Sequence, residues 1–216
     1  MCAVVQNPIT GRSSGSFAGA IFQKWKNKNV LRSKPIQVNN PNTVAQQMRR
    51  GMFGFCVETA RLIRPVIEIG FSTFKATETW MNSFIKYNNG ELVVAGTAPA
   101  FTIEFGDMAV SSGPLTKTLI ASIDAADGNA TVVVTWDTAL AGIDQNASDE
   151  PIVLVYNETR DEFGSSIATV LRSAGTVNIT MPVDSSTSDS LIAYLFFRSA
   201  DGSTVSDNTE ESHTVA

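Results

Sequence analysis

Apolar residues recur three or four positions apart along one stretch in the first third of the chain. A helix places such residues on one face, and Pro65 would end it, because the residue before a proline disfavours helical backbone. Thr43 and Gln46 have the spacing of a capping box, in which the side chain of each accepts a hydrogen bond from the backbone N–H of the other. The pattern predicts a long helix over about 43–64. Its apolar stripe is Ala45, Met48, Met52, Cys56, Ala60 and Ile63.

Gly51 and Gly54 fall inside this helix. Each costs about 1 kcal/mol relative to alanine. They are either tolerated imperfections or positions where another backbone approaches closely.

Shorter elements are predicted on both sides of the helix. Two β-favouring runs at 20–25 and 30–34 flank an Asn-bearing loop and indicate a β-hairpin. The alternating run at 66–71 indicates a strand, and apolar residues at helical spacing over 77–87 indicate a second helix. Three more short strands are expected at 92–94, 101–105 and 108–110.

Beyond Gly113 and Pro114 the apolar residues alternate with polar ones, which is the period of a half-buried strand. Two near-continuous apolar runs, 151–156 and 191–197, suit central strands that are covered on both faces. Six or seven short strands with regular turns are typical of an immunoglobulin- or fibronectin-like β-sandwich. The alternating sets are Leu119, Ala121 and Ile123; Val132, Val134 and Trp136; and Val177, Ile179 and Met181.

The predicted fold is thus an α+β N-terminal segment, made of a β-hairpin plus the long helix, followed by an all-β immunoglobulin- or fibronectin-like sandwich. The Gly-Pro pair at 113–114 is the expected boundary. We expect a flexible, glycine- and serine-rich arm at 1–19, an α+β domain at 20–113, the sandwich at 114–212 and a short tail at 213–216.

Charge divides the 216 residues unevenly. Residues 1–66 hold ten Lys or Arg and one acid, Glu58, and so carry +9. Residues 67–216 hold six basic and twenty acidic residues and carry −14, which together gives the net charge of −5. Such asymmetry indicates an electrostatic partner, either nucleic acid or the acidic part of another copy.

Basic and aromatic residues of the N-terminal half are the candidate contacts for this partner. Lys24, Trp25 and Lys26 interleave an aromatic ring with cations, the combination that stacks on bases while neutralising phosphates. The alternative is a solvated hairpin with Trp25 folded onto the long helix. The candidate assembly or phosphate-contact residues are Lys24, Trp25, Lys26, Lys28, Arg32, Lys34, Arg49 and Arg50.

The sequence offers little for catalysis or metal binding. The one histidine, His213, falls in the C-terminal tail, where we expect it to be solvated rather than held in a triad. Cys2 and Cys56 are too few for a disulfide framework or a zinc site, and Cys56 is expected to pack as a small hydrophobic residue. We predict no catalytic residue, no metal and no cofactor.

Acidic residues are numerous, but their spacing predicts no site. The adjacent pairs Asp149–Glu150 and Asp161–Glu162 would point to opposite faces of a strand or be solvated in loops. A calcium site would lack the bidentate Glu and the full ligand set of a dedicated loop. Its three candidate residues are Asp124, Asp127 and Asn129.

Several short motifs carry a family resemblance. Arg32-Ser33-Lys34-Pro35, the run Asn-Pro-Asn-Thr-Val-Ala-Gln-Gln at 40–47, and Arg50 resemble the signature of a domain family of unknown function found in Bacteroidota and their phages. The similarity continues at 67–71, 87–88, 112–115 and 199–202, so it covers nearly the whole chain. It supplies no catalytic residues and implies a structural or assembly protein, such as a phage virion component.

We therefore expect a non-enzymatic structural protein, of a phage capsid, neck or tail, that forms homo-oligomers or docks on other virion proteins. The chain shows no signal-peptide pattern and no apolar stretch near the ~20 residues that span a bilayer, which favours a virion or cytoplasmic location without membrane insertion. One alternative is a nucleic-acid-binding protein that uses the basic half. Another, a carbohydrate-binding or adhesion module, rests on fold analogy alone.

Overall fold

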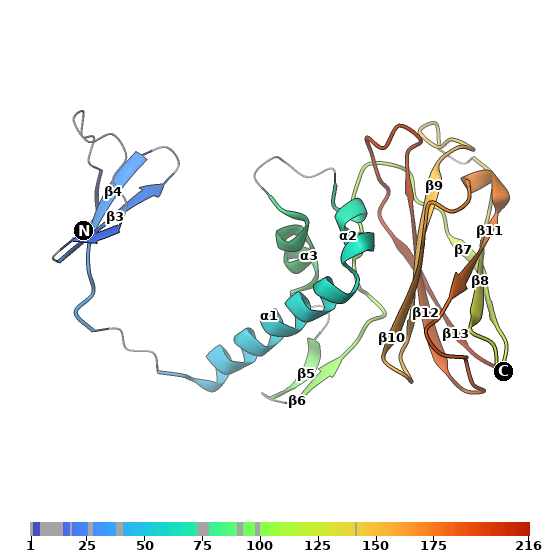
Figure 1. Ribbon diagram of the computed structural model, residues 1–216, viewed down its shortest axis with the longest axis horizontal. Helices are drawn as coiled ribbons and strands as arrows, with labels where there is room; N and C mark the ends of the chain where they lie inside the picture. Colours follow the sequence, from blue (N-terminus) through green and yellow to red (C-terminus); the bar gives the residue numbers. More distant parts are fainter. Residues whose placement is uncertain are drawn as a thin grey trace. The chain divides into compact units, whose positions relative to one another are not determined.

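The chain divides into two compact units, Met1–Asn42 and Thr43–Ala216 (Figure 1). Together they are mostly β-structure, with antiparallel sheets and a few short helices. The computed structural model describes residues 2–4, 15–17, 19–25, 28–37, 41–72, 78–89, 93–97, 100–140 and 142–216.

The N-terminal unit is a four-stranded antiparallel sheet in the order β1-β4-β3-β2. The hairpin predicted here is confirmed, although its second strand begins earlier, since Lys28 already pairs with Trp25. Two strands lie inside the range predicted as a flexible arm, so these parts of the arm belong to the sheet instead. The strands are β1 (Cys2–Val4), β2 (Gly15–Phe17), β3 (Ala20–Trp25) and β4 (Lys28–Ser33).

The long helix is confirmed as α1 (Val44–Leu62), with Thr43 as its N-cap. The capping box is present. The Thr43 hydroxyl oxygen accepts a hydrogen bond from the Gln46 N–H at 3.4 Å, and Gln46 Oε1 accepts one from the Thr43 N–H at 3.3 Å. The predicted second helix is α3 (Trp80–Asn88), whose first turn is capped by the Thr79 side chain.

The prediction of a strand at 66–71 is wrong, because residues 66–70 belong to a helix, α2 (Arg64–Gly70), and Phe71 is its C-cap. Pro65 lies in its first turn. There the missing proline N–H would have had no intrahelical partner in any case, and the fixed proline φ suits the helix. The proline therefore ends α1 and starts α2.

The larger unit contains two antiparallel sheets and a small two-stranded one. One sheet has the order β11-β8-β7 and the other β10-β9-β12-β13, while β5 pairs with β6. The segment 108–110, predicted as a strand, is irregular. The strands are β5 (Val93–Thr97), β6 (Ala100–Ile103), β7 (Ile120–Ala125), β8 (Thr131–Trp136), β9 (Glu150–Asn157), β10 (Glu162–Ile167), β11 (Thr176–Thr180), β12 (Ser190–Arg198) and β13 (Thr209–Thr214).

The central strands β9 and β12 are buried on both faces, as predicted from their continuous apolar runs. On one face Leu154 and Phe196 share a core with helix residues such as Ile67. On the other face Val155 and Phe197 share a second core with the β11-β8-β7 sheet. The unit therefore has three layers, which are the helices, the four-stranded sheet and the three-stranded sheet (Figure 1). Residues on both sides of the boundary predicted at 113–114 contribute to the first core.

A bulge alters the predicted alternation in β7. The register shifts between Ile120 and Ser122, so the strand has one extra residue there. As a result Ile120 and Ile123 pack on the core, while Leu119 is 71% exposed and Ala121 is exposed. A bulge of one residue reverses the faces of the side chains before it.

The last residues of the chain also belong to the fold. β13 pairs with β12, with His213 opposite Leu191, and Val215 is buried in the second core. The prediction that His213 lies in a tail is therefore wrong, because it belongs to β13, where its side chain is partly exposed.

Candidate functional site

The structure places the predicted contact residues in both units. Lys24 and Trp25 end β3, Lys28 and Arg32 belong to β4, and Arg49 and Arg50 lie on α1. Trp25 and Lys28 are cross-strand partners, as are Ile21 and Arg32. Arg32, Lys34, Arg49 and Arg50 are exposed, whereas Lys26 lies outside the described residues.

The described side chains of the N-terminal sheet form almost no core of their own. Among its described side chains only Val30 is buried, at 8% exposure. Ile21 and Phe22 are neighbours in β3 and so lie on opposite faces, and both are partly exposed. Phe22 is paired with Leu31, which is also partly exposed. Both faces of this sheet thus present apolar side chains to whatever covers them.

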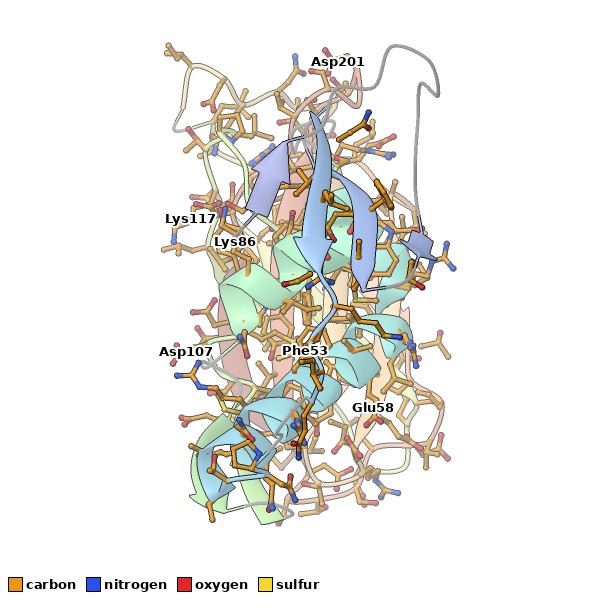
Figure 2. All side chains as sticks on the ribbon, turned by 90° about the vertical axis from the view of Figure 1, so that its left-hand side faces the viewer. Phe53, Glu58, Lys86, Asp107, Lys117 and Asp201 are labelled. Carbon is orange, nitrogen blue, oxygen red and sulfur yellow. The ribbon has the colours of Figure 1, made fainter. Side chains whose placement is uncertain are left out.

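Helix α1 carries one apolar stripe whose two halves differ in burial. In the C-terminal half, Cys56 and Ala60 are fully buried in the first core. In the N-terminal half the same stripe lines a groove of about 600 Å³, together with Arg49 and Asn89. Phe53, labelled on α1 in Figure 2, is 51% exposed. The described residues that line this groove, which we call the α1 groove, are Ala45, Met48, Arg49, Met52, Phe53 and Asn89.

The α1 groove is basic. Residues 41–57 include Arg49 and Arg50 and contain no acid. Methionine side chains are flexible and polarisable, and they line binding surfaces that adapt to a partner. The groove is therefore suited to an apolar segment with carboxylates at its margins.

A second apolar surface lies on the loop that follows β8. We call residues 137–140 and 142–144 the acidic loop, because Asp137 and Asp144 flank its apolar side chains. Leu140 is 51% exposed and Ile143 is fully exposed. The Asp144 carboxylate accepts hydrogen bonds from the Thr116 N–H and hydroxyl, both at 2.6 Å. These bonds lower the pKa of Asp144 and keep it charged.

A buried ion pair supports the base of the acidic loop. Arg172 has no exposed surface; its Nε lies 3.2 Å from an Asp149 carboxylate oxygen, and its Nη1 donates to the Thr118 hydroxyl. The guanidinium also lies 3.6 Å from the ring centroid of Phe197. Gln145, the residue after the loop, donates to the same Thr118 hydroxyl at 3.3 Å.

This ion pair has a cost as well. Burial lowers the pKa of Arg172, because desolvation disfavours the charged guanidinium, and the nearby Asp149 opposes this effect. Of the two alternatives predicted for Asp149 and Glu150, solvation in a loop is wrong for Asp149, which precedes β9 and whose buried carboxylate neutralises a buried cation.

The described residues show no assembled metal site. They contain no cluster of three or more His, Cys, Asp or Glu that could hold an ion. Of the calcium candidates, Asp127 accepts from the Thr187 N–H at 3.0 Å and Asn129 accepts from the Thr131 N–H at 2.9 Å. The Asp127 oxygen therefore links two loops, and the Asn129 oxygen stabilises a turn. The described helices are also all too short or too polar to cross a membrane.

Segments that carry the family resemblance make backbone contacts. The Ser112 N–H donates to the Gly70 carbonyl at 3.1 Å, and the Gly113 N–H donates to the Asp207 carboxylate at 3.0 Å. A Cβ at Gly70 would collide with the Val110 carbonyl oxygen, and one at Gly113 with that of Val205. These glycines allow two chain segments to approach closely, so both residues have a structural role in the motifs that carry the resemblance.

Sequence reasoning identified the charges of this site but not its apolar parts. The stripe predicted for α1 includes Ala45, Met48 and Met52 as core residues, and nothing in the pattern separates them from Cys56 and Ala60. For Leu140 and Ile143, the only sequence signal is the presence of large apolar residues in a loop.

Comparison with known proteins gives a family and no activity. The chain matches no curated protein. A family model described as "Family of unknown function (DUF6266)" matches residues 12–210. The chain therefore belongs to this family of unknown function, DUF6266.

Proposed function

We propose that this protein is a non-enzymatic structural subunit that assembles with other copies of itself, as part of a phage virion component such as a capsid, neck or tail. The supporting observation is the N-terminal sheet, which has apolar side chains on both faces and a single buried residue among those described. In the proposed assembly, a neighbouring copy covers these apolar side chains and removes their surface from water.

The charge distribution supports association between copies. The N-terminal unit carries the exposed Arg32 and Lys34, whereas residues 67–216 carry −14. Each surface ion pair contributes only about 0–1 kcal/mol. Several such pairs steer two copies together and fix their register, while apolar contacts supply most of the affinity.

We also propose that the two larger sheets form an immunoglobulin-like sandwich. From β7 to β13, the first, second and fifth strands make one sheet, and the third, fourth, sixth and seventh make the other. This division corresponds to strands A, B, E and strands C, C′, F, G of that architecture. In the proposed assembly the sandwich is the rigid body that presents the outward surface.

Sedimentation of the full chain tests the proposed function. We expect the wild type to form a defined oligomer free of nucleic acid, and a variant with Arg32→Glu and Lys34→Glu to associate more weakly. High salt shortens the Debye length from about 10 Å at 0.1 M to about 3 Å at 1 M. It should therefore slow assembly more than it dissolves existing complexes.

A matched control makes the same charge change elsewhere. Lys86 and Lys117, labelled in Figure 2, are exposed in the larger unit, and their reversal to Glu should leave the oligomer unchanged. A wild type that stays monomeric under all conditions contradicts the proposed function. Association that requires added DNA supports the nucleic-acid-binding alternative instead.

A further inference from the structure

The α1 groove and the acidic loop both present apolar side chains, and their charges are opposite. The groove is apolar with Arg49 at its side, and residues 41–57 contain no acid. The loop presents Leu140 and Ile143 between two exposed carboxylates. We propose that the acidic loop of one copy inserts Leu140 and Ile143 into the α1 groove of the next copy. This contact rests on the proposed function and adds a second pair of surfaces to the N-terminal sheet.

The groove needs an occupant from outside its own helix. Its stripe continues that of Cys56 and Ala60, which the first core covers completely. Past Cys56 toward the N-terminus, the described residues leave Phe53 half exposed, and Val44 is 63% exposed. A volume of about 600 Å³ is ample for two aliphatic side chains, since pockets of several hundred Å³ accept whole small molecules.

The loop of the same copy cannot fill this groove. α1 belongs to the helical layer, which covers one face of the four-stranded sheet. The acidic loop follows β8, a strand of the three-stranded sheet on the other face. Because the four-stranded sheet separates these layers, the contact must join two copies. It is a heterologous contact, of the kind that closes into rings or continues as a filament.

Charge favours the loop over a second copy of the helix as the occupant. Two α1 helices packed groove to groove would bring Arg49 of each copy into one interface, and like charges there are unfavourable. Asp137 and Asp144 instead offer carboxylates on both sides of the apolar pair. The loop base is already held by the bonds of Asp144 to Thr116 and of Gln145 to Thr118. Such pre-organisation reduces the entropy lost on binding.

Substitutions in the full chain test the contact from both sides. Ile143→Asp in the loop and Phe53→Glu in the groove should each weaken the self-association constant at least tenfold in sedimentation equilibrium. Val183→Asp, at another exposed apolar position, and Leu62→Glu, at a position of α1 that is 70% exposed, are the matched controls and should change it less than twofold. Circular dichroism spectra should match the wild type, because all four side chains are exposed.

Cross-linking identifies which surfaces meet. In a Cys2→Ser background, F53C and I143C copies are mixed and treated with a short bismaleimide. The mixture should yield a covalent dimer, and a double F53C/I143C variant should yield a ladder of multimers. Either single variant alone, or L62C mixed with I143C, should yield neither.

The outcomes separate the two proposals. A monomeric wild type would overturn the proposed function, and this contact with it. An oligomeric wild type that neither Ile143→Asp nor Phe53→Glu weakens would overturn only the contact. Weakening by Phe53→Glu alone, without the mixed cross-link, would mean that the groove holds another occupant and would also overturn it.

Discussion

Arg172 is a charged residue with a purely structural environment. Its guanidinium is buried beneath the acidic loop, paired with Asp149 and stacked on Phe197. Removing a charge from water is costly, and a buried pair recovers this only when its hydrogen bonds are well made. Because Nη2 of Arg172 has no hydrogen-bond partner among the described residues, we expect the pair to contribute more to the defined geometry of the loop than to the free energy of unfolding.

Gly70 shows how a single missing side chain allows two segments to meet. We expect Gly70→Ala to lower the free energy of unfolding by about 1–3 kcal/mol, which is typical of overpacking, because the new Cβ collides with the Val110 carbonyl oxygen. Urea denaturation of the full chain measures this change.

The matched control is Gly54→Ala on α1. A Cβ at Gly54 meets nothing within 4 Å, and alanine is favoured over glycine within a helix by about 1 kcal/mol. This variant should therefore be slightly more stable than the wild type. Equal effects of the two substitutions would contradict the close approach at Gly70.

At the scale of elements, α1 is both a core helix and a surface helix. Its last turns pack against α3 and contribute to the core shared with the four-stranded sheet, whereas its first turns line the α1 groove. Cys56 marks the change between these parts, because its side chain is fully buried and its Sγ donates to the Asn88 carbonyl at 3.7 Å.

Thiol labelling tests where the covered part of α1 begins. Burial raises the pKa of Cys56 and so disfavours the reactive thiolate. We expect Cys56 to resist a maleimide in the native protein and to react after denaturation, as followed by mass spectrometry. A Cys2→Ser variant isolates the signal of Cys56. Rapid native labelling in that variant would contradict the packing of the helix.

Local patterns predict many of these elements, and tertiary structure decides the rest. The capping box of α1 and the alternation in β8 and β11 are readable because each depends on near neighbours. The run 66–71 suits a strand or a helix equally well, and in the structure most of it belongs to α2, which packs beside α3, β9 and β12. The bulge in β7 leaves no sequence signal, so its faces cannot be assigned beforehand.

The same limit applies to the candidate site. Sequence charge identifies Arg49 and Arg50 as exposed, because such side chains are rarely buried. It cannot tell that Phe53 or Ile143 is exposed, since their exposure depends on how far the neighbouring layers of the fold extend over them. It also cannot tell that Asp149 is buried, because its partner Arg172 is distant in the chain.

At the scale of the whole molecule, the larger unit is one continuous packing of three layers. The four-stranded sheet supplies side chains to both cores. In the core that it shares with the helices, the Tyr194 hydroxyl donates a hydrogen bond to the Phe105 carbonyl. The helices and the two larger sheets therefore stabilise each other.

Truncation tests this mutual dependence. A fragment of residues 115–216 would expose the face of β9 and β12 that the helices cover, including Leu154 and Phe196. Burying such a side chain contributes about 1.5–3 kcal/mol. We expect this fragment to aggregate or to unfold without cooperativity, whereas a fragment of residues 43–216 should unfold in one cooperative transition. A soluble, cooperatively unfolding 115–216 fragment would contradict the shared core.

The double burial of β9 and β12 also affects the protein during its synthesis. The ribosome releases the chain from the N-terminus, so α1, α2 and α3 emerge before β9, and β9 emerges before β12. Since β12 contributes to both cores, neither can close until Phe197 has left the exit tunnel. An apolar strand without its neighbours is prone to pair with the same strand of another nascent chain. A half-made chain thus exposes both faces of the run 151–156 to solvent. In the folded chain both faces are buried.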